Sequence, residues 1–136
     1  MAKKKKAARP ASKRATKPAS KPCPTRRSPC PIACTLDVIG DRWTLLVVRD
    51  LFLGRTRFKE FTASPESIPT NILSERLQRL LQSGVIKQVP ASDGSKRLAY
   101  ELTDKGDALR PLIKAVTKWG LQWEEGTRIG MTPLEK

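Results

Sequence analysis

The segment PTNILSERLQRLLQSG, residues 69–84, governs how the rest of the chain is interpreted. Its leucines recur at spacings of three and four, which is typical of an amphipathic helix with one buried face. Pro69 suits the first turn of a helix, and Gly84 suits the position just beyond its end. The segment therefore predicts a helix over residues 69–83 that buries its leucines and presents polar side chains on the opposite face.

The hydrophobic pattern changes after this helix. Residues 85–89 (VIKQV) and 97–102 (RLAYEL) have the composition of strands, and a turn with Asp93 and Gly94 separates them. They predict a two-stranded hairpin within residues 86–102. Thr103 can then cap a long helix with an apolar face, in which Pro111 predicts a kink or an interruption.

Before residue 69, cap and turn residues divide the chain into three short predicted helices, over residues 35–39, 42–53 and 58–61. Gly40 ends the first, Asp41 can cap the second, and Thr56 is available to cap the third. The predicted order is α-α-α-α-β-β-α. This is a mainly α fold class with a small β-hairpin, and it is the plan of a winged helix-turn-helix in which the hairpin is the wing.

Composition removes most classes of enzyme. The chain has 136 residues, no His and three Cys, so Ser-His-Asp and Cys-His catalytic arrangements and His-ligated metals are excluded. We identify no carboxylate pair, phosphate-binding glycine loop or zinc-type cysteine spacing. We therefore expect a protein that is not an enzyme and has neither a cofactor nor a metal site.

The positive charge is concentrated at the N-terminus. The whole chain carries 27 Lys+Arg against 13 Asp+Glu, a net charge of +14, and residues 1–29 hold eleven of the cations and no acid. That segment has no Leu, Ile, Val or aromatic residue, so we expect a disordered basic tail over residues 1–29 and a folded domain over residues 30–136. Neither a secretory signal nor a membrane-spanning run is recognisable, which favours a cytoplasmic, nucleoid-associated protein.

Several short motifs occur in an order that resembles the HxlR-type family of bacterial transcriptional regulators. They are CPIACTLDVIGDRW (30–43), RFKEF (57–61), IPTNILSERL (68–77), GVI (84–86) and YELTDKG (100–106). The resemblance covers roughly residues 30–125 and leaves out the basic tail. It implies a dimeric, sequence-specific DNA-binding protein, with dimer contacts from the first and the long C-terminal helix. Repression is the default expectation for this fold, although activation is equally compatible with the residues.

The polar face of the helix over residues 69–83 has side chains that suit a major groove. Amides pair with adenine, arginine pairs with guanine, and a helix start can meet a phosphate. The candidates are Thr70, Asn71, Ser74, Gln78 and Arg79. Taken alone, the same face is more typical of a solvated helix surface than of a DNA-reading one. The winged helix-turn-helix order of elements favours DNA recognition.

Four further cations are candidates for DNA contact. Lys96 and Arg97 lie at the far end of the wing turn, where a basic side chain can enter a narrow minor groove. A charged hairpin tip that keeps a strand soluble is the alternative interpretation. Arg55 and Arg57 precede the third helix and are expected to contact phosphates, which position a protein without reading the sequence.

The C-terminal helix carries Val116, Trp119 and Trp123 on one face. These residues could cap the domain's own core, but large aromatic residues near a chain end favour an association surface. A two-fold homodimer would place two recognition helices about one DNA turn apart and predicts an inverted-repeat operator.

The N-terminal cysteine position of the family coincides with Cys30, and some members sense oxidants or electrophiles there. Arg26, Arg27 and the basic tail would favour the thiolate that such chemistry requires. Cys30 could equally pack as a small apolar residue, and Cys34 is expected to be buried. Redox sensing at Cys30, or a response to a small-molecule effector, is thus a hypothesis.

The tail motivates alternatives of another class. Its cations could add phosphate contacts to any DNA, so a non-specific, DNA-compacting nucleoid protein is the alternative to a regulator. Attachment to RNA or to an anionic membrane, or an organelle transit peptide, is also compatible with charge alone. No membrane partner is expected from the rest of the chain.

Overall fold

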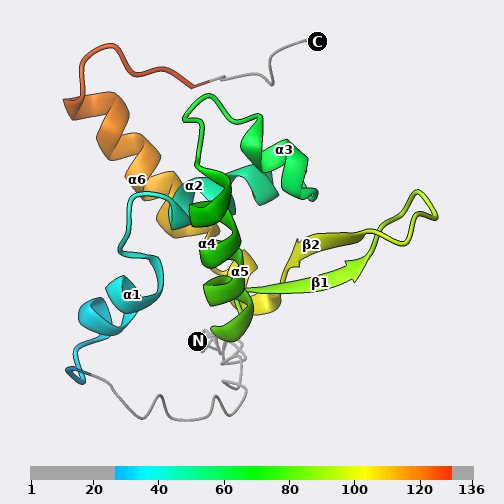
Figure 1. Cartoon of the computed structure of the whole chain (residues 1–136). Helices are drawn as coiled ribbons and strands as arrows, with labels where there is room; N and C mark the ends of the chain where they lie inside the picture. Colours follow the sequence, from blue (N-terminus) through cyan, green and yellow to red (C-terminus); the bar gives the residue numbers. More distant parts are fainter. Residues whose placement is uncertain (1–26, 130–136) are drawn as a thin grey trace, which may run out of the picture.

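A computed structural model describes residues 27–129 of the protein. Six helices and two strands follow one another within this range (Figure 1): α1 (Pro31–Ile39), α2 (Thr44–Phe52), α3 (Phe58–Thr62), α4 (Thr70–Gln82), β1 (Ile86–Pro90), β2 (Leu98–Leu102), α5 (Asp104–Asp107) and α6 (Arg110–Trp123). This is the predicted mainly α winged helix-turn-helix. No helix within the described range is long and apolar enough to cross a membrane. The predictions for the basic tail fall almost entirely on residues 1–26, outside the described residues.

The first two helices differ from the predictions at their starts. The first begins at Pro31, four residues earlier than expected, because proline is well tolerated in the first turn of a helix. Asp41 acts at the start of α2 as predicted: its Oδ1 accepts hydrogen bonds from the backbone N–H groups of Trp43 (2.9 Å) and Thr44 (3.0 Å). The helix itself starts at Thr44 rather than at residue 42.

The cap of α3 was wrongly predicted. The carboxylate of Glu60, not the hydroxyl of Thr56, satisfies the backbone at this helix start. Glu60 Oε2 accepts hydrogen bonds from the N–H groups of Thr56 (2.7 Å) and Arg57 (2.9 Å). This is one half of a capping box, in which a side chain in the first turn accepts hydrogen bonds from the backbone N–H groups that precede the helix.

The C-terminal helix is interrupted, as Pro111 predicts. Thr103 Oγ1 accepts a hydrogen bond from the Gly106 N–H at 3.3 Å and caps the short α5. A second helix then begins at Arg110, and Pro111 lies in its first turn. Backbone N–H groups in the first turn have no acceptor within the helix, so the missing N–H of proline costs no helical hydrogen bond.

The hairpin projects away from the helices (Figure 1), and its register places Ile86 opposite Leu102 and Val89 opposite Ala99. The extended chain before α3 joins it, because the Tyr100 N–H donates to the Thr56 carbonyl at 2.9 Å. The wing is therefore anchored at its base to the segment that leads into α3.

The core lies between α2, α3, α4 and the start of β1. Its most deeply buried side chains are Val48, Phe61, Leu73, Leu77, Leu80 and Val85. Full burial of such a side chain contributes about 1.5–3 kcal/mol. Because three leucines of α4 are held here, the orientation of that helix about its own axis is fixed, and its polar face is turned outward. None of the residues of α6 is fully buried.

Candidate nucleic-acid interface

The outer face of α4 is a continuous polar surface. It consists of the exposed residues Thr70, Asn71, Ser74, Glu75, Gln78 and Arg79. Figure 1 shows α4 running through the middle of the molecule, with the hairpin beginning close to its C-terminal end. The structure thus brings five of the predicted site residues together on one helix.

Arg79 lies at the edge of this surface that adjoins α1. Its Nη2 is 3.4 Å from the carbonyl oxygen of Asp37, a long hydrogen bond between exposed groups. The Asp37 carboxylate is itself paired with Arg27, whose Nε lies 2.8 Å from Oδ1. Exposed pairs of this kind contribute little to stability, so Arg79 can exchange this partner for a base or a phosphate.

Arg76 points inward from α4 and does not belong to the polar surface. Its Nε lies 3.1 Å from Oδ1 of Asp41, the residue at the start of α2. Burial opposes ionisation of Asp41, but hydrogen bonds from Thr44 and from the backbone outweigh it, and together with Arg76 they lower the pKa of this carboxyl. The recognition helix is therefore tied to α2 by charge as well as by its leucines.

The wing carries two unpaired cations. Lys96 and Arg97 are exposed, and neither forms an ion pair with any other residue of the described range. They lie in the connection between the strands, which the Ala91 N–H closes by donating to the Arg97 carbonyl at 3.1 Å. The structure therefore leaves both side chains free to approach DNA.

Arg57 is joined to the wing. Its guanidinium forms an ion pair with Asp93 in the turn of the hairpin. The backbone and side chain of Ser95, and then Arg57, lower the pKa of Asp93 to about 2. A quarter of the Arg57 side chain remains exposed, at 25%.

Arg55 is paired with acidic and polar groups within the domain. Its side chain is only 12% exposed, and its Nη1 is 3.2 Å from Asp50 Oδ2 and 3.2 Å from Ser64 Oγ. Asp50 is 2% exposed, so this cation offsets a buried negative charge. No local sequence pattern indicates that this acid would be buried, because its burial depends on the tertiary fold. The contact of Arg55 with a phosphate stays a prediction.

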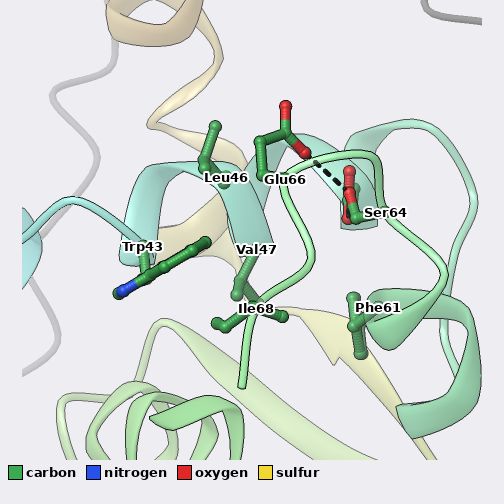
Figure 2. A pocket seen from close by; sticks show the side chains of 8 residues that line it. Trp43, Leu46, Val47, Phe61, Ser64, Glu66 and Ile68 are labelled. Atoms are coloured by element: carbon green, nitrogen blue, oxygen red, sulfur yellow. Dashed lines mark hydrogen bonds between the residues drawn. The ribbon is translucent and has the colours of Figure 1, made fainter. Parts of the chain in front are cut away.

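Sequence reasoning also missed a polar cluster between α2 and the turn before α4. Arg49 and Asp50 interrupt an otherwise apolar helix, TLLVVRDLF, and this is the one signal that could have revealed it. Beside the cluster is a small hollow (Figure 2). Its lining includes Trp43, Ile68 and Glu66.

Exposed apolar side chains lie on α6 and α1. Val116, Trp119 and Trp123 of α6 are 50%, 58% and 64% exposed, so the described residues do not bury them in the domain's own core. Ile32 and Leu36 of α1 are likewise exposed. We call these exposed apolar residues, Val116, Trp119 and Trp123 of α6 with Ile32 and Leu36 of α1, the terminal-helix surface.

The cysteines that the structure describes lie at the start of α1. Cys30 is exposed at the N-cap, and Cys34 is half-buried rather than buried as expected, with its thiol donating to the Ser28 carbonyl at 3.2 Å. Cys23 lies outside the described residues. Residues 27–129 contain no group of three or more Cys, Asp or Glu side chains placed to hold a metal ion.

Comparison with known proteins supplies the identity of this fold. The profile of the family described as HxlR-like helix-turn-helix matches residues 38–128. The HTH-type transcriptional regulator YvaP of Bacillus subtilis is 38% identical over 88 residues, which are 65% of this chain and 82% of YvaP.

Two solved structures agree in fold. The crystal structure of PA1607 has a TM-score of 0.68 and 45% identity, covering 82% of this chain and 72% of PA1607. The reduced form of the transcriptional regulator YodB from B. subtilis has a TM-score of 0.60 and 30% identity, covering 73% of this chain and 98% of YodB. The protein is thus a DNA-binding transcriptional regulator rather than an enzyme, and it belongs to the HxlR-like helix-turn-helix family.

Proposed function

We propose that α4 reads an operator in the major groove through Asn71, Ser74, Gln78 and Arg79, while Thr70 meets a phosphate at the helix start. One observation carries this proposal: the polar face of α4 is exposed, while Leu73, Leu77 and Leu80 hold the opposite face in the core. Amide side chains suit adenine and a guanidinium suits guanine, so this face has the chemistry of base readout.

The wing completes the interface in this proposal. Lys96 and Arg97 enter the adjacent minor groove, and Arg57 contacts a phosphate near the wing. The basic segment over residues 1–29 adds phosphate contacts that do not depend on sequence, which would associate the protein with the nucleoid.

We further propose that the protein binds DNA as a homodimer through the terminal-helix surface. Exposed apolar side chains that include two tryptophans are typical of an association site. A two-fold axis through it would place two copies of α4 on one side of the DNA and would require an inverted-repeat operator. Repression by occupying a promoter is the mode of action that needs no further contact.

The test is fluorescence anisotropy of the full chain with two duplexes, across a salt series. One duplex is selected by the wild-type protein from a randomised library, and the other has the same composition in scrambled order. Asn71→Ala should weaken binding to the selected duplex by about 1–3 kcal/mol and leave binding to the scrambled duplex nearly unchanged. Glu125→Gln, a change at an exposed position outside the helices, is the control and should alter neither.

Equal losses on both duplexes would contradict base readout by α4. Deleting residues 2–29 should have the opposite signature, a shallower salt dependence on both duplexes alike. If the wild-type protein binds both duplexes with equal affinity, the result supports the non-specific DNA-compacting alternative. The family relationship does not favour that alternative.

A response to oxidants at Cys30 is a second proposal, carried by the exposure of this thiol at the N-cap of α1. YodB has been solved in a reduced form and bound to a quinone, and the redox regulator HypR in reduced and oxidized forms. Diamide treatment should change the affinity for the selected duplex in the wild type and not in Cys30→Ser. If both proteins respond alike, Cys30 is not the sensor.

A further inference from the structure

A polar cluster connects α2 to the turn that precedes the recognition helix. We call it the turn clasp, and it consists of Arg49, Asp50, Ser64 and Glu66. Arg49 Nη1 donates to Glu66 Oε1 at 2.7 Å, and Nη2 donates to Glu66 Oε2 at 3.0 Å. In such a bidentate ion pair the planar guanidinium fixes the orientation of the carboxylate as well as its distance.

The remaining members connect this pair to the interior. Arg49 Nε donates to Asp50 Oδ1 at 3.0 Å, and Ser64 Oγ lies 3.0 Å from both Asp50 Oδ2 and Glu66 Oε2. Figure 2 shows Ser64 and Glu66 on the same loop, joined by their hydrogen bond at the rim of the hollow. Asp50 is buried, and its charge is offset by both Arg49 and Arg55.

The turn itself is tightly constrained. The Ser67 N–H donates to the Ser64 carbonyl at 2.9 Å, and Ser67 has a φ of 51°, a left-handed conformation that is uncommon for a residue with a side chain. Such a conformation persists where its surroundings hold it. Ile68 is buried directly after it, and Pro69 then has a φ of −59°, so little freedom remains before α4 begins.

The position of Glu66 gives it influence over the base-reading residues. Glu66 lies five positions before Asn71, which is the second residue of α4. The leucines of α4 fix which face of the helix is buried, and Arg76 ties the middle of the helix to Asp41 at the start of α2. The direction of its N-terminal end depends in addition on the turn that leads into it. The turn clasp holds that end, and readout by hydrogen bonds tolerates only small displacements of donor and acceptor.

We propose that Arg49 and Glu66 are positioning residues for sequence recognition: their ion pair sets the tilt at which α4 presents Asn71 to the base edges. Neither residue touches DNA in this proposal. The inference rests on the proposed readout by Asn71. The experiment that tests it distinguishes a failure of the positioning role from a failure of that readout.

The experiment is a double-mutant cycle measured on the full chain with the selected and scrambled duplexes described above. The variants are Glu66→Gln, Asn71→Ala and the double variant, and the readout is the ratio of the two affinities. Glu66→Gln should lower the preference for the selected duplex about tenfold. In the Asn71→Ala background the same change should lower the preference much less, because the Asn71 side chain that Glu66 positions is then absent. Glu125→Gln removes the same charge from an exposed position and should leave the ratio unchanged.

Arg49→Lys is the companion variant. It keeps the positive charge but cannot form two parallel hydrogen bonds, so it should reproduce the loss of preference while near-ultraviolet circular dichroism and binding to the scrambled duplex stay close to the wild type. This variant separates positioning from folding if Glu66→Gln proves unstable.

The outcomes are distinct. A preference that is unchanged in Glu66→Gln and Arg49→Lys, or effects of Glu66→Gln and Asn71→Ala that simply add, would overturn the positioning role. If Asn71→Ala alone leaves the preference unchanged, the proposed readout by Asn71 fails, and the positioning role assigned to Glu66 fails with it.

Discussion

The guanidinium of Arg57, at the start of α3, is ion-paired with the carboxylate of Asp93 in the turn of the wing. These residues are 36 positions apart in the sequence, and their contact joins the helical part of the domain to the tip of the hairpin. Thr56, next to Arg57, joins the base of the hairpin through its carbonyl. The wing is therefore held at two points by one short segment.

Asp93→Asn is expected to strengthen binding to DNA of any sequence. The change removes a negative charge near Lys96 and Arg97 and releases Arg57 to meet a phosphate. The salt dependence should steepen by about 0.9 in log-log slope for each added phosphate contact. Anisotropy titrations across a salt series would show this, with Asp104→Asn as a control that removes an exposed charge near the start of α5. Weaker binding would indicate that the ion pair is needed to hold the wing in place.

Replacing Trp119 and Trp123 together by Ala should convert a dimer to a monomer without unfolding it. Both side chains are mostly exposed, so little of the core is lost. Sedimentation equilibrium measures the change, and the weaker DNA binding of a monomer would follow from the loss of coupling between two half-sites. Leu98→Ala, an equally conspicuous apolar change on the wing, should leave the association state unaltered. A wild-type protein that sediments as a monomer would remove the proposed interface.

Gly106→Ala should destabilise the domain by about 1–3 kcal/mol, as expected for overpacking at a closed site. A Cβ at Gly106 would overlap the Val85 carbonyl oxygen and would lie 2.8 Å from a methyl group of Leu102. The first atom belongs to the backbone and cannot turn aside. Urea unfolding measures the effect, and Gly120→Ala on α6, where a Cβ meets nothing within 4 Å, is the matched control. Equal stability of both variants would contradict this account.

The order of elements was accessible from the sequence because it depends on local signals. The leucine spacing of residues 69–83 and the proline at 111 act over one or two helical turns, and the structure confirms both. The exposed polar face of α4 follows from the same pattern. Such signals need no knowledge of which segments meet in space.

The partners of charged side chains were not accessible in this way. Arg55 was expected to contact phosphates, yet it forms an ion pair with Asp50, five positions earlier, because the fold buries that carboxylate. Glu66 and Arg49 are 17 positions apart and meet only because the turn before α4 folds back on α2. A sequence shows the charges, but the tertiary fold decides which of them pair.

The turn clasp also predicts how stability responds to acid. The hydrogen bonds from Arg49, against an opposing effect of burial, lower the pKa of Glu66 from 4.5 to about 2. A carboxyl with a lowered pKa in the folded state stabilises that state above its unfolded pKa, and this stabilisation is lost as the pH falls toward the folded pKa. The free energy of unfolding should therefore fall between about pH 4.5 and 2, and Glu66→Gln should lose less stability than the wild type over this interval. Urea unfolding at a series of pH values measures both, with Glu125→Gln as the control. If the wild type and Glu66→Gln lose stability in parallel, the ion pair with Arg49 does not stabilise the folded state.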